Sequence, residues 1–183
     1  MLFENTSWWQ MLVWAVLLWM PQNAIHEYSH GLMAKHWKYT IDKVRLYPDL
    51  IDADKDGKVD RVYFAWVETG KPEDREANPT ELGSIDIAPQ LVNTLVLTVL
   101  FMVRFVFWPE MPLWAASFVA VLALHNWIDG SFNMLSIFRK QGSNDTWRYM
   151  RRWEIPLLPL RNAVLSWSVF WGSALFWGFW HHL

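Results

Sequence analysis

Four stretches of this chain are almost free of charged side chains, and their length constrains the fold more than any other feature. Residues 8–20 carry no charge, and each later stretch keeps a single one: Arg104 in 88–108, Asp129 in 111–138 and Arg161 in 155–180. A bilayer core of ~30 Å is crossed by about 20 helical residues. We therefore predict an all-α polytopic membrane protein, a single domain over residues 1–183, with about four transmembrane helices, over residues 7–35, 88–108, 112–138 and 157–180. The alternative is four buried helices of a water-soluble domain.

Composition supports this class. Trp occurs 15 times and 53% of the residues are hydrophobic, so the mean hydropathy of +0.05 reflects a scale that scores Trp as mildly polar. The aromatic content excludes a disordered chain, the lack of Cys excludes a disulfide scaffold, and a net charge of −2 disfavours a nucleic-acid partner. Nine Trp residues fall near the predicted helix ends, as in aromatic belts: Trp8, Trp9, Trp37, Trp108, Trp114, Trp147, Trp153, Trp177 and Trp180.

The distribution of Lys and Arg predicts the orientation. Loop 34–87 contains nine of them and loop 139–154 contains five, whereas the opposite side has Arg104 near a helix end. By the positive-inside rule both loops are cytoplasmic and both termini are outside. We expect an integral protein of a prokaryotic cytoplasmic membrane. Because no basic region precedes the first apolar run, we expect that run to stay in the mature chain rather than to act as a cleaved signal peptide.

Residues 37–87 form a hydrophilic insertion after the first helix. Residues 43–47 alternate in polarity and residues 61–67 are rich in β-branched and aromatic side chains, which predicts a small β-hairpin. Its tip reads D-x-D-x-D-G-x-x-D, a pattern that supplies alternate oxygens to Ca²⁺, and the alternative is an unmetallated turn. The candidate calcium residues are Asp52, Asp54, Asp56, Lys58 and Asp60. Residues 69–83, with several Gly and Pro, suggest a flexible connector.

The first helix carries an H-E-x-x-H motif, His26-Glu27-Tyr28-Ser29-His30. Residues four apart share one face of a helix, so both imidazoles can bind one Zn²⁺. Glu27 is then placed to act as general base. Ionisable groups within a membrane helix are costly and indicate function. The alternative is a polar cluster where the helix leaves the membrane.

A catalytic zinc site usually has three protein ligands. Asp129 is the one charged residue of the third predicted helix and lies at a depth similar to His26 and His30, so we predict it as the third ligand, with a helix–helix hydrogen bond as the alternative. His125, one turn earlier, is a candidate hydrogen-bond partner of a metal ligand, or a ligand in place of Asp129. Asn93 and Asn126 are candidate oxyanion donors.

These motifs resemble the site-2 protease family of intramembrane zinc metalloproteases. His26 to His30 is similar to the family's zinc motif, Ile128-Asp129-Gly130 to its Asp-Gly motif, and Ala88-Pro89-Gln90-Leu91-Val92-Asn93 to its Gly-Pro-x-x-Asn motif, with Asn one position late. The resemblance implies a core of three transmembrane helices, zinc bound by both His and the Asp, and cleavage of substrate transmembrane segments.

The predicted function is therefore intramembrane zinc-dependent hydrolysis of peptide bonds in membrane-embedded or membrane-associated substrates, with Zn²⁺ as cofactor and Ca²⁺ in the insertion. One alternative is an inactive membrane scaffold with a protease-like fold. A transporter with Asp129 and the His residues as a proton relay is another. A di-iron oxidase would need a second E-x-x-H, which these helices lack.

Overall fold

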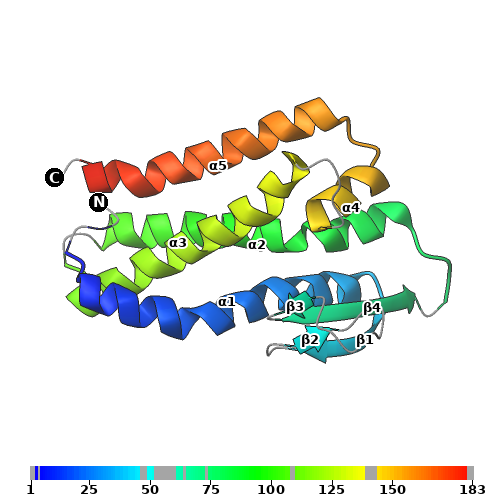
Figure 1. Cartoon of the computed structure of the whole chain (residues 1–183), viewed down its shortest axis with the longest axis horizontal. Helices are drawn as coiled ribbons and strands as arrows, with labels where there is room; N and C mark the ends of the chain where they lie inside the picture. Colours follow the sequence, from blue (N-terminus) through cyan, green and yellow to red (C-terminus); the bar gives the residue numbers. More distant parts are fainter. Residues whose placement is uncertain are drawn as a thin grey trace.

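The computed structural model describes residues 3, 5–45, 49–51, 61–63, 65–72, 74–107, 110–138 and 144–180. Four long helices dominate this part of the chain: α1 (Trp8–His36), α2 (Pro79–Val106), α3 (Leu113–Leu135) and α5 (Leu157–Trp180). They run side by side along the long axis (Figure 1). Each covers one of the four predicted segments, so the mostly helical fold class is confirmed. A short 3-10 turn, η1 (Ser136–Phe138), and a short helix, α4 (Asp145–Arg152), connect α3 to α5.

The second helix begins at Pro79 rather than at residue 88. The side chain of Asn78 caps it by accepting a hydrogen bond from the Thr80 N–H (2.9 Å), and Pro at the first helical position favours the same start. The predicted flexible connector over residues 69–83 is therefore partly wrong, because its ends belong to a strand and to α2. A local Asn-Pro cap signal outweighed the general Gly and Pro content of the segment.

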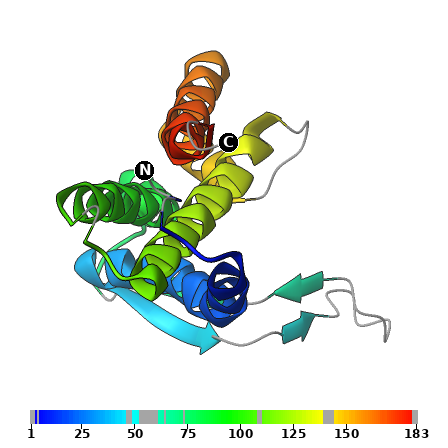
Figure 2. The same cartoon turned by 90° about the vertical axis from the view of Figure 1, so that its left-hand side faces the viewer.

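The predicted hairpin after the first helix is confirmed. Strand β1 (Tyr39–Arg45) pairs antiparallel with β4 (Trp66–Pro72), and farther out β2 (Asp49–Ile51) pairs antiparallel with β3 (Arg61–Tyr63). The β1–β4 ladder lies along one half of α1 (Figure 1), and the β2–β3 ladder extends away from the helices (Figure 2). The predicted calcium residues 52–60 lie between β2 and β3, outside the described residues.

The helices pack through small side chains at their centre. Ala116, Ala120 and Ala123 of α3 are fully buried and let α3 approach α2 closely, around Leu97. Helices α1, α2 and α3 pack against one another, whereas α5 packs on α3 and lies at one edge of the bundle (Figure 2). Among the packed helices, α1 and α3 also carry the predicted zinc residues, so this core places those residues in one bundle.

Polar side chains lie inside the helix bundle and large apolar side chains lie on its outside, the reverse of the pattern usual in water-soluble proteins. Gln22, Asn93 and Asn126 are at most 6% exposed in the bundle interior, while Trp9 and Val16 are each 77% exposed on its outside. Among the described helices, α2 alone is long and apolar enough to cross a membrane by the criteria of length and composition, with a mean hydropathy of 1.7. The four predicted spans therefore remain a prediction at this point.

Candidate metal centre

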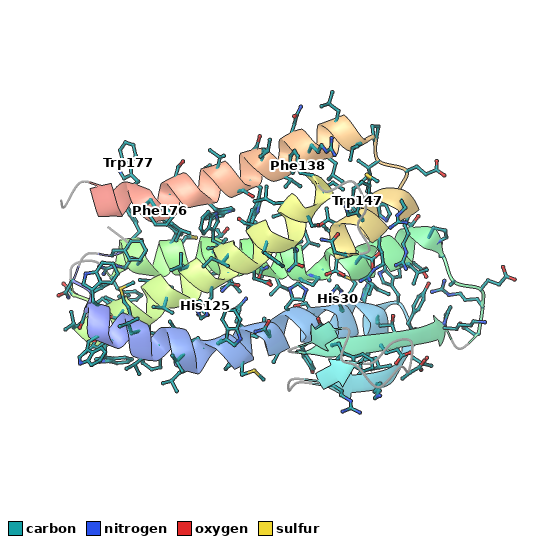
Figure 3. All side chains as sticks on the ribbon, in the orientation of Figure 1. His30, His125, Phe138, Trp147, Phe176 and Trp177 are labelled. Carbon is teal, nitrogen blue, oxygen red and sulfur yellow. The ribbon has the colours of Figure 1, made fainter. Side chains whose placement is uncertain are left out.

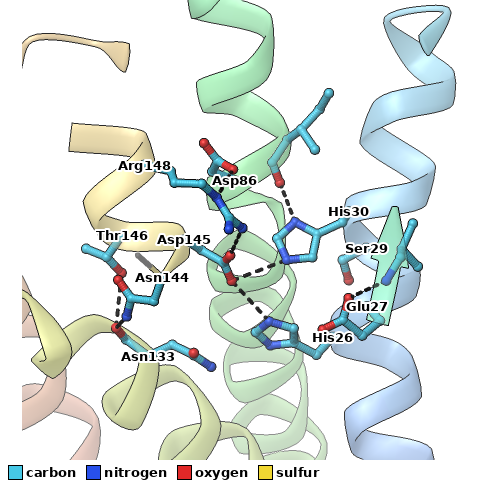
Figure 4. A network of polar contacts seen from close by, with 12 residues as sticks. His26, Glu27, Ser29, His30, Asp86, Asn133, Asn144, Asp145, Thr146 and Arg148 are labelled. Atoms are coloured by element: carbon cyan, nitrogen blue, oxygen red, sulfur yellow. Dashed lines mark hydrogen bonds and ion pairs between the residues drawn. The ribbon is translucent and has the colours of Figure 1, made fainter. Parts of the chain in front are cut away.

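The two histidines of the motif lie beside an acidic residue that is distant in the sequence, Asp145. His26 and His30 lie one turn apart on α1, and both are 7% exposed. The Nε2 atoms of His26 and His30 are 3.4 Å and 3.3 Å from the same carboxylate oxygen, Oδ2 of Asp145 on α4 (Figure 4). One ligand atom from each residue falls within 4.8 Å of the others. These three residues form the candidate metal centre.

The hydrogen bonds of the two rings leave Nε2 as the ligand atom in each. Nδ1 of His30 is 2.7 Å from the carbonyl oxygen of Ile85, and Nδ1 of His26 is 2.8 Å from Oδ2 of Asp129. A ring nitrogen that donates to such an oxygen carries the proton, so a neutral imidazole then offers the lone pair of its other nitrogen. Two unprotonated Nε2 atoms that face the same carboxylate oxygen suit a cation bound between them, whereas without a cation an Nε2–H donates to that oxygen.

Two of the three separations between the ligand atoms suit a tetrahedral metal, and the third is within 4.8 Å. Ligand atoms ~2.0–2.1 Å from a tetrahedral zinc are separated by roughly 3.3–3.4 Å from one another. The observed separations from Asp145 Oδ2 are 3.4 Å and 3.3 Å, longer than the ~2.9–3.0 Å usual for an N–H···O hydrogen bond. The residues present therefore fit a zinc ion held by two histidines and one carboxylate.

Asp145 is held in place by the docking of α4 on α3. The Asn144 side chain caps α4 by accepting from the Trp147 N–H (3.2 Å), and its Nδ2 donates to the Asn133 carbonyl (2.7 Å). The Thr146 hydroxyl donates to the same carbonyl (3.2 Å). These bonds tie the first turn of α4 to the end of α3, so Asp145 enters the centre from a fixed position.

A charged cluster fixes the other side of α4. Arg148 donates to Asp145 and, through Nε, to Asp86 of α2 (3.0 Å), while Arg152 donates to the other oxygen of Asp86 (2.7 Å). Burial lowers the pKa of Arg148, but Asp145 and Asp86 outweigh it and raise the pKa above its ordinary value. Burial also raises the pKa of Asp145, but the two imidazoles and Arg148 bring it well below its usual range. Asp145 is therefore ionised, as a metal ligand must be.

Asp129, the predicted third ligand, contacts the opposite side of the His26 ring. Its Oδ2 also accepts from Asn93 (2.8 Å), and its Oδ1 accepts from Asn133 (3.1 Å). Asp129 therefore contacts Nδ1 of His26, whereas the residue that lies near Nε2 of both rings is Asp145. Sequence reasoning missed Asp145 because it lies outside the predicted spans. The available signal was the Asn-Asp pair that starts a short helix.

Glu27 lines the same cavity as the candidate metal centre. This cavity has a volume of about 770 Å³ and is bounded by α1, β4, α2, α3 and α4. Oε2 of Glu27 accepts a hydrogen bond from the backbone N–H of Val67 on β4 (2.9 Å). The hairpin therefore fixes the carboxylate, which leaves Oε1 to interact with a substrate or water.

The other predicted site residues lie away from the cavity. Asn93 donates its amide to Asp129, and Asn126 donates to Gln22 (3.2 Å) and to the Leu122 carbonyl (2.7 Å). Both are 1% exposed between helices, and neither lines the cavity in the described part of the chain. His125 packs edge-on against Trp19 and also lies outside the cavity, farther along the bundle than His30 (Figure 3). The structure thus places all three at helix contacts.

The comparisons with known proteins give no identification. Neither a family model, nor a curated protein, nor a solved structure matches the chain. The resemblance to site-2 proteases therefore rests on the motifs quoted above.

Proposed function

We propose that this chain is an integral membrane zinc metalloprotease. The observation that carries the proposal is the convergence of His26 Nε2, His30 Nε2 and an oxygen of Asp145, beside the carboxylate of Glu27 in one cavity. Two histidines and a carboxylate are a common ligand set of catalytic zinc, with the fourth position open to water. We assign Asp145 as the third ligand, in place of Asp129.

The charges around the cavity support a divalent cation. Four carboxylates line it, from Glu27, Asp86, Asp129 and Asp145, and they face the guanidinium groups of two arginines on α4. If both imidazoles are neutral, two negative charges remain in excess, and one Zn²⁺ would balance them. Unbalanced charges in a buried site are expensive, so the balance favours a bound metal.

The residues around the ligands have separable roles. Asp129 accepts from Nδ1 of His26 and orients that ring, while the Ile85 carbonyl does the same for His30. When bound, zinc supplies a Lewis acid that activates water and polarises a peptide carbonyl. Glu27, held by the Val67 N–H, takes the proton from the attacking water at Oε1 and passes it to the nitrogen of the leaving amine. The water oxygen bonds to the carbonyl carbon first, and the peptide C–N bond breaks once its nitrogen has received the proton.

The distribution of side chains supports a membrane location. Apolar residues are exposed along all four long helices, although water-soluble monomers rarely expose apolar patches of more than a few hundred Å². The buried amides of Gln22, Asn93 and Asn126 bond one another inside the bundle, as polar side chains in membrane bundles do. The exposed residues include Trp9, Val16, Trp19, Leu95, Met102, Phe105, Trp114, Phe132, Leu158, Val169, Phe170 and Trp177.

Zinc content tests the metal assignment. We expect the purified chain to contain close to one equivalent of zinc, and His30→Ala to lose it because one ligand is removed. His36→Ala is the matched control, since His36 is an exposed histidine of the same helix that packs edge-on against Trp37. Cleavage of casein in detergent should stop with a zinc chelator and return with added Zn²⁺. A metal-free wild-type protein would instead favour the scaffold alternative.

Cysteine labelling tests the membrane topology. The chain has no Cys, so a single introduced cysteine reports its own side of the membrane. Glu76 precedes α2 and Glu110 lies between α2 and α3, and both are exposed. We expect Glu76→Cys to be shielded from an impermeant maleimide in intact cells and Glu110→Cys to react with it. Equal labelling of both, or release of the protein by alkaline carbonate, contradicts the four-span topology.

A further inference from the structure

A second cavity, of about 630 Å³, lies between α1 and β1, and we name it the α1–β1 groove. On the helix side its lining recurs at intervals of three and four residues, which places that lining in one stripe along α1. On the other side the turn after α1, strand β1 and one residue of β4 close the groove. The complete lining is Tyr28, Gly31, Leu32, Lys35, Lys38, Tyr39, Thr40, Ile41, Val44 and Val67.

The groove has an apolar end and a basic end. Leu32 is 52% exposed and Val44 is 47% exposed. Lys35 and Lys38 are exposed at the last turn of α1 and just beyond it. No acidic residue lines the groove in the described part of the chain, and no ion pair with another described residue engages either lysine. The groove therefore matches an elongated ligand with a negatively charged head and an apolar body.

The direction of the groove matches that of a lipid in the inner leaflet. From Tyr28 to Lys35 the helix advances roughly 10 Å, toward the end of α1 that the positive-inside rule places in the cytoplasm. We propose that the α1–β1 groove binds one anionic phospholipid, with its phosphate at Lys35 and Lys38 and an acyl chain along Leu32 and Val44. This proposal rests on the membrane location proposed above, but not on protease activity.

The groove also adjoins the catalytic cavity through one residue. The Val67 side chain lines the groove, and its backbone N–H holds Glu27. Helix α1 lies close to the hairpin here, because a Cβ at Gly31 would be in van der Waals contact with Ile41 Cδ1 (3.5 Å) and Val67 Cγ1 (3.8 Å). A lipid that fills the groove packs against the same strand that fixes the carboxylate. Lipid binding therefore supports the position of Glu27.

Native mass spectrometry of the full chain in detergent tests the proposal by counting bound lipid. We expect phosphatidylglycerol to bind more tightly than phosphatidylcholine. The double variant Lys35→Gln/Lys38→Gln should bind phosphatidylglycerol roughly 10- to 30-fold more weakly, since each lysine near an anionic surface contributes about 1 kcal/mol. Lys43→Gln/Lys71→Gln removes the same charge from strands β1 and β4 outside the groove, and should bind as the wild type does.

A second variant tests the apolar end. Gly31→Leu leaves both lysines and fills the groove, so it should lose the phospholipid; retained zinc shows that its fold is intact. If Gly31→Leu loses zinc as well, its fold is disturbed, and the comparison of Lys35→Gln/Lys38→Gln with Lys43→Gln/Lys71→Gln decides whether the groove binds the lipid. Equal binding of the two lipids, an unchanged affinity of the lysine variant, or full displacement by inorganic phosphate or an acidic peptide overturns the lipid site. Zinc content and casein cleavage are measured separately, so failure of the protease proposal leaves the lipid count interpretable.

Discussion

Replacing Glu27 with Gln is expected to abolish most peptide hydrolysis while leaving the zinc content unchanged. Glu27 is the one carboxylate of the H-E-x-x-H motif, and it lines the cavity without being a member of the ligand group. Gln keeps the shape of the Glu27 side chain and can still accept the hydrogen bond from the Val67 N–H, but it cannot act as a base for the proton of water. Loss of a general base lowers rates about 10²- to 10⁴-fold, so cleavage should fall by that factor. The measurement is casein cleavage at equal zinc occupancy.

Glu81→Gln is the matched control for this variant. Glu81 is a carboxylate at the start of α2 that bonds Arg75 (2.7 Å) and Tyr39 (3.2 Å), away from the cavity. It should keep both zinc and activity. If Glu27→Gln cuts at the parent rate, Glu27 is not the base and the protease proposal fails. If Glu27→Gln loses zinc, the carboxylate instead takes part in holding the metal.

The second large effect distinguishes the two aspartates at the metal centre. Asp145→Asn is expected to lose zinc under conditions in which Asp129→Asn retains part of it. Asp145 approaches Nε2 of both histidines, whereas Asp129 contacts one of the two histidines, His26, at Nδ1. Loss of such an orienting partner costs roughly 10- to 100-fold in metal affinity, and loss of a ligand should cost more. Competition with a zinc chelator of known affinity measures both variants on one scale.

Glu154→Gln serves as control, because Glu154 is the other acidic residue of the 139–154 loop and is exposed. The reverse order, with Asp129→Asn more damaging than Asp145→Asn, would restore the ligand set that the sequence predicted. It would also mean that α4 docks near the centre without supplying a ligand. Cobalt substitution adds a spectroscopic readout, since the visible bands of Co²⁺ report the geometry of the ligands directly.

Much of the fold followed from local patterns in the sequence. Near-chargeless runs identified the four long helices. Alternating polarity before an Asp-rich turn and β-branched and aromatic residues after it identified the hairpin. The start of α2 was mistaken because the Asn78-Pro79 cap was not weighed against the Gly and Pro content of its surroundings. In each case the decisive information lay within a few residues of the element itself.

The residues of the candidate site fall into two groups, those that local sequence patterns determine and those that only the tertiary structure brings together. The sequence by itself determined His26, Glu27 and His30, because spacing along one helix is a local property that any α-helix converts into a shared face. Only the tertiary structure decided that Asp145 completes the group and that Asp129 orients His26. Asp145 is 119 residues from His26 and reaches it through the docking of α4 on α2 and α3, which no local pattern encodes. The candidate ligand set is therefore a property of how the helices pack.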